Sequence, residues 1–212
     1  MKNLKRILAV LLAAIILAGS FVIPVAASDT NEDEVVARMY IGHKARYANL
    51  SGHTWIYIEN LTNHELTVGV YPLQKGKGVS LGTYGYSIAD GRGLYYNAEA
   101  YRYMNVDMSD AIYLSKDLTQ KQLDKVSKTI RHSGAWSYFL NCAYFAIKVW
   151  NASFGQPLIY VLFPTFHQLQ ILINPKHGNG FEMPAVKMDD VYKQIGRGDS
   201  ATLIPADPRV PD

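Results

Sequence analysis

The strongest constraint on the fold comes from the run 53–59 (HTWIYIE), which is rich in β-branched and aromatic residues. Such residues favour strands, and here apolar side chains occupy both of the alternating faces. A strand that is apolar on both faces is typical of the interior of a sheet that is covered on both sides. We therefore predict a central strand at 53–59, and the rest of the fold has to supply a layer on each side of it.

Further strands are predicted around this one. The turn 60–63 (NLTN) is followed by 64–71 (HELTVGVY), which we predict to be the return strand of a hairpin. Turn sequences rich in glycine separate the later candidates, which are 79–84, 94–97 and 111–115. The pattern predicts a mainly antiparallel sheet.

Helices are predicted after the strands. Thr119 and Gln122 have the spacing of a capping box, and Leu118 and Leu123 that of a hydrophobic staple. The sequence 132–134 (HSG) ends this helix, and a later helix is predicted over 166–173. Strands followed by helices predict an α+β fold, with an antiparallel sheet packed against helices.

The only cysteine of the chain, Cys142, lies at the predicted start of another helix. Asn141 is a good N-cap, and Gly155 provides a stop. In the first turn, free N–H groups and the helix dipole favour a thiolate, the nucleophilic form of cysteine. The alternative is a small apolar residue buried beneath the helix start.

The N-terminus has the pattern of a secretory signal peptide. Lys2, Lys5 and Arg6 precede the apolar run 7–18, and the small residues of 25–27 (VAA) predict cleavage after Ala27. The alternative is an uncleaved membrane anchor. With cleavage, we expect a secreted protein without a stable membrane span, and attachment to the cell surface stays open.

Removal of residues 1–27 leaves 18 basic and 18 acidic residues, a net charge near zero. No basic stripe is present, which argues against nucleic acid as a partner.

A single cysteine in an exported protein cannot form an internal disulfide, so its thiol has to be either buried or used in the function of the protein. No histidine or cysteine shows metal-ligand spacing, and we expect neither a metal nor a cofactor. The oligomeric state is not predicted.

Three regions are predicted after the signal peptide. Residues 28–47 form an N-terminal arm, in which 35–47 has mixed character and predicts a short helix or an extended segment. Residues 48–195 form the folded domain. Residues 196–212 form a C-terminal tail, for which proline and charge predict disorder.

A thiolate nucleophile needs a base, and His53 is the candidate among six histidines. It opens the central strand, where an imidazole can be held rigidly at the edge of the sheet. The alternative is an edge-strand histidine without chemistry. Six tyrosines also fall between positions 84 and 103, where they either line a groove or serve core packing.

The order of these motifs resembles the circularly permuted papain-like superfamily, which includes permuted relatives of NlpC-type cell-wall peptidases and lecithin retinol acyltransferase. The resemblance rests on Gly52, His53, Trp55 and Ile56, followed by Asn141, Cys142, Phe145 and Ala146. It covers about half of the mature chain. The pattern at 148–151 is also similar to a group of uncharacterised secreted proteins from Gram-positive bacteria.

The resemblance implies that Cys142 is the nucleophile and that His53 is the general base and acid. The backbone N–H of Cys142 would hold the oxyanion, with one side-chain donor as a possible addition. In the superfamily a third polar group on the strand after the histidine orients the imidazole. Here a hairpin places Val70 opposite His53, so His64 is the tentative third member, and Asn63 has the same weakness of lying close to the turn.

Three functions follow as expectations. The first is a secreted cysteine hydrolase that cleaves amide bonds, with peptidoglycan peptide as the expected substrate. The second is acyl transfer to or from a lipid by the same chemistry. The third is a secreted binding module on the same fold, in which the cysteine pair is idle, and the absence of a clear orienting residue favours it.

Overall fold

The structure is a computed structural model that describes residues 34–45, 52–155, 157–161 and 164–209. The compact unit runs from Asp33 to Asp212, and it is an α+β fold, which confirms the predicted class. The predicted signal peptide and residues 28–33 and 46–47 of the predicted arm lie outside the described residues.

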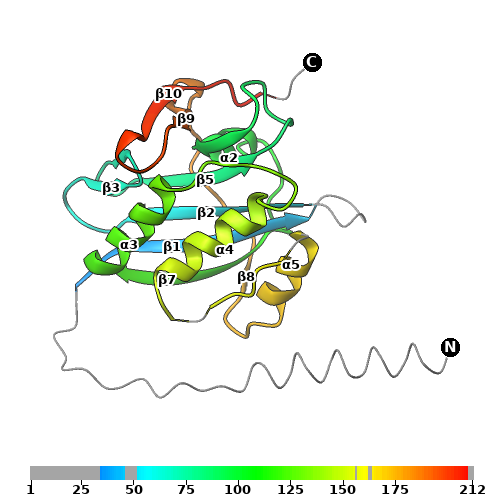
Figure 1. The fold of residues 1–212 in the computed structure, drawn as a ribbon. Coiled ribbons are helices and arrows are strands. Elements are labelled where there is room, and N and C mark those ends of the chain that lie inside the picture. Colours follow the sequence, from blue (N-terminus) through cyan, green and yellow to red (C-terminus); the bar gives the residue numbers. More distant parts are fainter. Residues whose placement is uncertain (1–33, 46–51, 156, 162–163, 210–212) are drawn as a thin grey trace, which may run out of the picture. The chain divides into compact units, whose positions relative to one another are not determined.

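The main sheet has eight strands in the order β10-β9-β6-β5-β2-β1-β7-β8, and every neighbouring pair is antiparallel (Figure 1). The strands are β1 (Val35–Ala45), β2 (Gly52–Asn60), β5 (Gly78–Tyr84), β6 (Gly93–Tyr96), β7 (Ile112–Thr119), β8 (Gly178–Asn179), β9 (Tyr192–Ile195) and β10 (Thr202–Pro205). The predicted central strand is β2, which lies between β5 and β1 in the interior of the sheet.

The described α-helices are α2 (Ala98–Arg102), α3 (Gln120–Arg131), α4 (Cys142–Ala152) and α5 (Pro164–Leu172). Two short 3-10 helices, η1 (Met188–Asp190) and η2 (Gly198–Ser200), lie near the C-terminus. The predicted capping box is present, since the Thr119 hydroxyl accepts from the Gln122 N–H and the Gln122 side chain accepts from the Thr119 N–H. Figure 1 shows α3, α4 and α5 on one face of the sheet.

Both faces of β2 are covered, as its sequence predicts. Ile56 and Ile58 point into the large core between the sheet and the helices, together with Ile147 of α4. Trp55 and Tyr57 point to the opposite face, where they belong to a smaller cluster with Phe181. All four side chains of β2 named here are almost fully buried, so this strand is the centre around which both layers pack.

The predicted return strand 64–71 is wrong. The chain instead forms β3 (Leu66–Val68) and β4 (Tyr71–Leu73), which pair with each other and not with β2. The Asn60 side-chain amide donates to the backbone oxygens of His64 and Leu73, at 2.7 and 3.0 Å, and so closes this excursion. The strand that pairs with β2 is β5, which comes later in the chain.

The sheet also extends beyond the predicted domain 48–195 at both ends. Residues 35–45, predicted as a short helix or extended arm, form the inner strand β1 between β2 and β7, because Met39 and Ile41 are buried in the core. The predicted disorder of 196–212 is wrong for 198–205, since this segment contains η2 and β10. Backbone pairing with β9 orders it.

Candidate active site

Cys142 is the first residue of α4, as predicted, and Asn141 is its N-cap. The Asn141 side-chain oxygen accepts a hydrogen bond from the Tyr144 N–H at 3.1 Å. The thiol is free and 8% exposed, so it is sheltered from bulk solvent while it lines a cavity. Its position at the helix start places the sulfur beside backbone donors at the positive end of the helix dipole.

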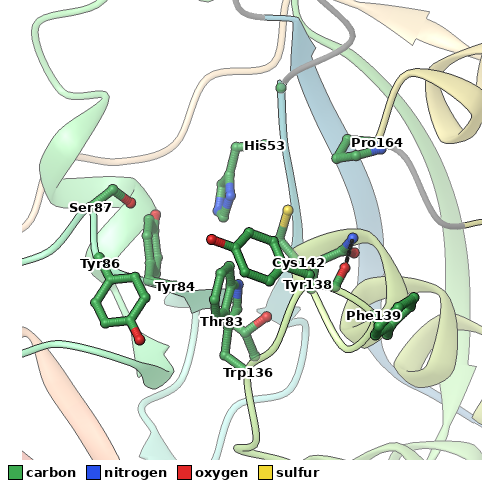
Figure 2. A pocket seen from close by; sticks show the side chains of 13 residues that line it. His53, Thr83, Tyr84, Tyr86, Ser87, Trp136, Tyr138, Phe139, Cys142 and Pro164 are labelled. Atoms are coloured by element: carbon green, nitrogen blue, oxygen red, sulfur yellow. Dashed lines mark hydrogen bonds between the residues drawn. The ribbon is translucent and has the colours of Figure 1, made fainter.

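The cavity opens where β2 and β5 separate. Their ladder runs from Glu59 opposite Gly78 to Ile56 opposite Leu81, although β2 begins at Gly52 and β5 continues to Tyr84. The ends of β2 and β5 that do not pair with each other line the cavity, and the start of α4 closes it from the helical side. A sheet that opens at one end thus brings His53 of β2 and Cys142 of α4 to the same cavity (Figure 2).

The His53 imidazole and the Cys142 thiol line the same cavity, and each shifts the pKa of the other through charge and hydrogen bonding. Burial by itself lowers the pKa of His53, but the negative charges of Cys142 and Glu99 outweigh it and raise this pKa to about 9. Burial raises the pKa of Cys142, but the His53 charge and hydrogen bonds from the backbone of Thr54 and Ala143 bring it below its ordinary value. Both shifts favour a thiolate–imidazolium pair at neutral pH.

Glu99 is the third member of this group, and the sequence analysis missed it. Its Oε1 lies 2.9 Å from His53 Nε2, and the carboxylate is fully buried while the imidazole is 16% exposed. Because Nε2 faces Glu99, Nδ1 is the nitrogen that is left for Cys142. The chain offered one signal, since Glu99 is the only acidic residue between Asp90 and Asp107.

Aromatic rings hold the imidazole in place. The Tyr84 ring stacks on His53 with centroids 4.6 Å apart, and the Trp55 ring is nearly parallel to it at 6.2 Å. Tyr84 and Trp55 are buried, so neither has room to move away. His53 is therefore fixed by packing as well as by Glu99, as a general base has to be.

Gly82 of β5 provides the space for the Glu99 carboxylate. A Cβ at this position would overlap Glu99 Oε1 and would lie 3.0 Å from His53 Nε2. We expect Gly82→Ala to displace the carboxylate, to destabilise the fold by about 1–3 kcal/mol, and to slow alkylation of Cys142 at acidic pH. Urea denaturation and iodoacetamide labelling measure the two effects.

The control is Gly91→Ala, where a Cβ meets nothing but a φ of 74° makes alanine strained. It lowers stability without touching the site. Equal labelling rates for Gly82→Ala and the wild type would contradict the role given to Gly82.

His64, the tentative third member, does not reach the site. It is exposed in the turn region after β2, where its Nδ1 contacts the Asn63 side chain. The prediction assumed that the chain after β2 returns as a hairpin strand beside it. Instead β3 and β4 pair with each other, so no strand beside β2 brings His64 toward His53. His132 and His177 each hydrogen-bond a backbone oxygen near a helix end.

His43 and His167 form a buried polar cluster with Thr54, behind the strand that carries His53. The Thr54 hydroxyl lies 3.0 Å from His43 Nδ1 and 3.3 Å from His167 Nδ1. A hydroxyl has one proton, so it donates to one ring and accepts from the other. Burial lowers the pKa of His43 to about 4 and that of His167 to about 3, which keeps both rings neutral.

We expect Thr54→Val to destabilise the protein, because valine keeps the shape but leaves two buried imidazoles without the bridging hydroxyl. The expected loss in the free energy of unfolding is about 1–3 kcal/mol, measured by urea denaturation. Thr54→Ser keeps the hydroxyl and is the control. Equal stability of the valine and serine variants would contradict the bridging role.

The cavity beside Cys142 has a volume of about 500 Å³. Its wall contains His53 and Cys142 together with a series of aromatic side chains, and Figure 2 shows the Cys142 sulfur and the His53 ring at the same cavity. This volume is within the range of small-molecule sites in proteins. Substrate-sized groups can therefore reach the sulfur.

Comparison with family models, with curated proteins and with solved structures finds no match to this chain. A function can therefore be proposed only from the geometry of the site.

In the described ranges, no helix combines the length and apolar character needed to span a membrane. The same residues contain no group of three or more His, Cys, Asp or Glu side chains placed to hold a metal ion.

Proposed function

We propose that this protein is a cysteine-dependent hydrolase that cleaves an amide bond through a thioester on Cys142. The observation that carries the proposal is the triad of Cys142, His53 and buried Glu99, with the pKa of the thiol lowered and that of the imidazole raised. A nucleophile, a base in contact with it and a third group that orients the base are the recurring parts of such sites.

The reaction follows from these groups. The Cys142 thiolate attacks the carbonyl carbon, and a C–S bond forms while the oxygen takes the negative charge. The free N–H at the start of α4 is the donor for this oxyanion. His53 gives its proton to the leaving nitrogen as the C–N bond breaks. It then takes a proton from water, which attacks the thioester and releases the acid and the thiolate.

Glu99 strengthens the proposal over a non-catalytic binding module. That alternative rested on the absence of a residue to orient His53, and Glu99 now supplies one at 2.9 Å. A carboxylate on Nε2 fixes the tautomer and stabilises the imidazolium that forms during the reaction. The order of a histidine strand before a cysteine helix also supports a permuted papain-like fold, which we propose on the resemblance.

The test is formation of an acyl-enzyme by the full chain. With p-nitrophenyl acetate we expect a burst of p-nitrophenol and an acetyl group on Cys142, detected by mass spectrometry of the intact protein. Cys142→Ala is the matched control and should show neither. A burst that persists in Cys142→Ala, or no acetylation of the wild type, would overturn the proposal.

A further inference from the structure

Five of the thirteen described residues that line the cavity beside Cys142 have a Tyr, Trp or Phe side chain. Tyr86 and Trp136 have ring centroids 6.1 Å apart, and Trp136 and Tyr138 are 5.6 Å apart, so three rings follow one another along the rim. Figure 2 shows these three side chains among those that line the cavity. We call them the aromatic rim.

The aromatic rim is accessible. Tyr86 is 67% exposed and Tyr138 is 79% exposed, and the neighbouring Phe139, which also lines the cavity, is 72% exposed. Single exposed apolar side chains occur elsewhere on this chain, but a contiguous group of exposed aromatic rings is typical of a binding surface. Its position at the mouth of a cavity that contains the nucleophile indicates that it contacts the substrate.

The rim also has a fixed backing. The Trp136 ring lies against the Gly85 backbone so closely that a Cβ at Gly85 would come within 2.6 Å of it. The Arg92 guanidinium lies 5.1 Å from the centre of the Tyr86 ring. Preformed aromatic surface binds apolar groups without the entropic cost of ordering it.

The described residues that line the cavity carry little charge, and Arg92, which stacks on the Tyr86 ring, is not among them. Among the described residues that line it, none has a carboxylate, and His53 is the only one with a basic side chain. His53 is already engaged by Glu99 and Cys142. A carboxylate on the acyl side of the substrate would lose hydration against these aromatic rings, and no described lining residue other than His53 has a charge to pair with it, which is unfavourable.

We propose that this cavity selects an uncharged, apolar acyl group, an aliphatic chain or an aromatic ring, and that the aromatic rim is its binding surface. The inference rests on the proposed function, since the acyl group is the one that Cys142 receives. It narrows the substrate away from the carboxylate-bearing peptides of peptidoglycan. The residues that determine specificity are then Tyr86, Trp136 and Tyr138.

The test compares p-nitrophenyl esters of increasing chain length with the full chain. From acetate to butyrate to octanoate, kcat/KM should rise about threefold to fourfold per buried methylene until the cavity is filled. The p-nitrophenyl monoester of succinic acid is the butyrate ester with its terminal methyl replaced by a carboxylate, and it should react at least about tenfold more slowly than butyrate. The benzoate ester distinguishes a ring from a chain as the preferred group.

Variants test whether the aromatic rim is responsible for the preference for longer acyl chains. Trp136→Ala should lower the ratio of octanoate to acetate activity by about tenfold or more. The matched control is Phe154→Ala, which removes an aromatic side chain that is 61% exposed but does not line the cavity. Its ratio should equal that of the wild type.

The outcomes separate the two proposals. If acetate does not acylate Cys142, the proposed function fails. If acetate acylates Cys142 but the chain-length series is flat, or the succinate ester matches butyrate, the inference about the acyl group is overturned and the hydrolase stands. New amino termini in purified peptidoglycan that depend on Cys142, together with a flat series, would also overturn it.

Discussion

Replacing His53 with alanine is expected to reduce kcat/KM for p-nitrophenyl acetate by about 10²–10⁴-fold, the usual contribution of a general base. The physical reason is twofold. Without the imidazolium, burial raises the pKa of the Cys142 thiol, so little thiolate is left at neutral pH. Among the described residues that line the cavity, no other imidazole or carboxylate is then in place to move protons to the leaving group and from water.

The matched control is His64→Ala, which removes an exposed imidazole outside the site. It should retain wild-type activity and stability. A His53→Ala variant that folds, as judged by urea denaturation, and still hydrolyses the ester at the wild-type rate would contradict the assignment of His53 as the base.

Replacing Glu99 with glutamine is expected to lower kcat/KM by about 10²–10⁴-fold, as happens when the orienting carboxylate of a triad becomes an amide. The change keeps the size of the side chain but removes the charge that helps to raise the pKa of His53. The measurement is kcat/KM as a function of pH.

The Glu99→Gln variant should shift the pH profile of kcat/KM in one direction. In the wild type, activity rises as Cys142 ionises and falls as His53 loses its proton near pH 9. Loss of the Glu99 charge lowers the pKa of His53, so the alkaline limb should move to lower pH. Glu59→Gln is the control, because Glu59 lies on the same strand as His53 but bonds Tyr40 instead. An alkaline limb that does not move would contradict the ion pair.

The parts of the site that the sequence predicts are those encoded locally. The helix start at Cys142 follows from Asn141 and the helical residues behind it, and the strand at His53 follows from a continuous run of β-formers. Both signals lie within a few residues of the side chain concerned. For that reason they could be read without knowledge of the tertiary structure.

Glu99 could not be found in this way. The helix α2 has five residues, too few to show a periodicity, and its N-cap Asn97 has a φ of 63° and makes no capping hydrogen bond. Glu99 reaches His53 only because α2 packs on β5 beside the opening in the sheet, and because Gly82 leaves room for it. These are contacts between distant parts of the chain.

The wrong prediction of His64 as the third site residue arose from trusting a local pattern too far. A local hairpin is the simplest partner for β2, and it predicted the wrong neighbour because β3 and β4 pair with each other. For β1 the sequence left a short helix and an extended segment open, because Arg38 and Lys44 obscure a strand that lies between β2 and β7 in the sheet. Strand order depends on pairing over long sequence separations, which local patterns do not specify.

The most direct measurement is the rate of alkylation of Cys142 by iodoacetamide across the pH range, because the chain has a single cysteine and every labelled thiol is this one. A thiolate paired with His53 predicts a titration midpoint clearly below the ordinary value of about 8.5. In His53→Ala the midpoint should move to that value or above it. A wild-type midpoint at about 8.5 or higher, unchanged by His53→Ala, would contradict the thiolate–imidazolium pair.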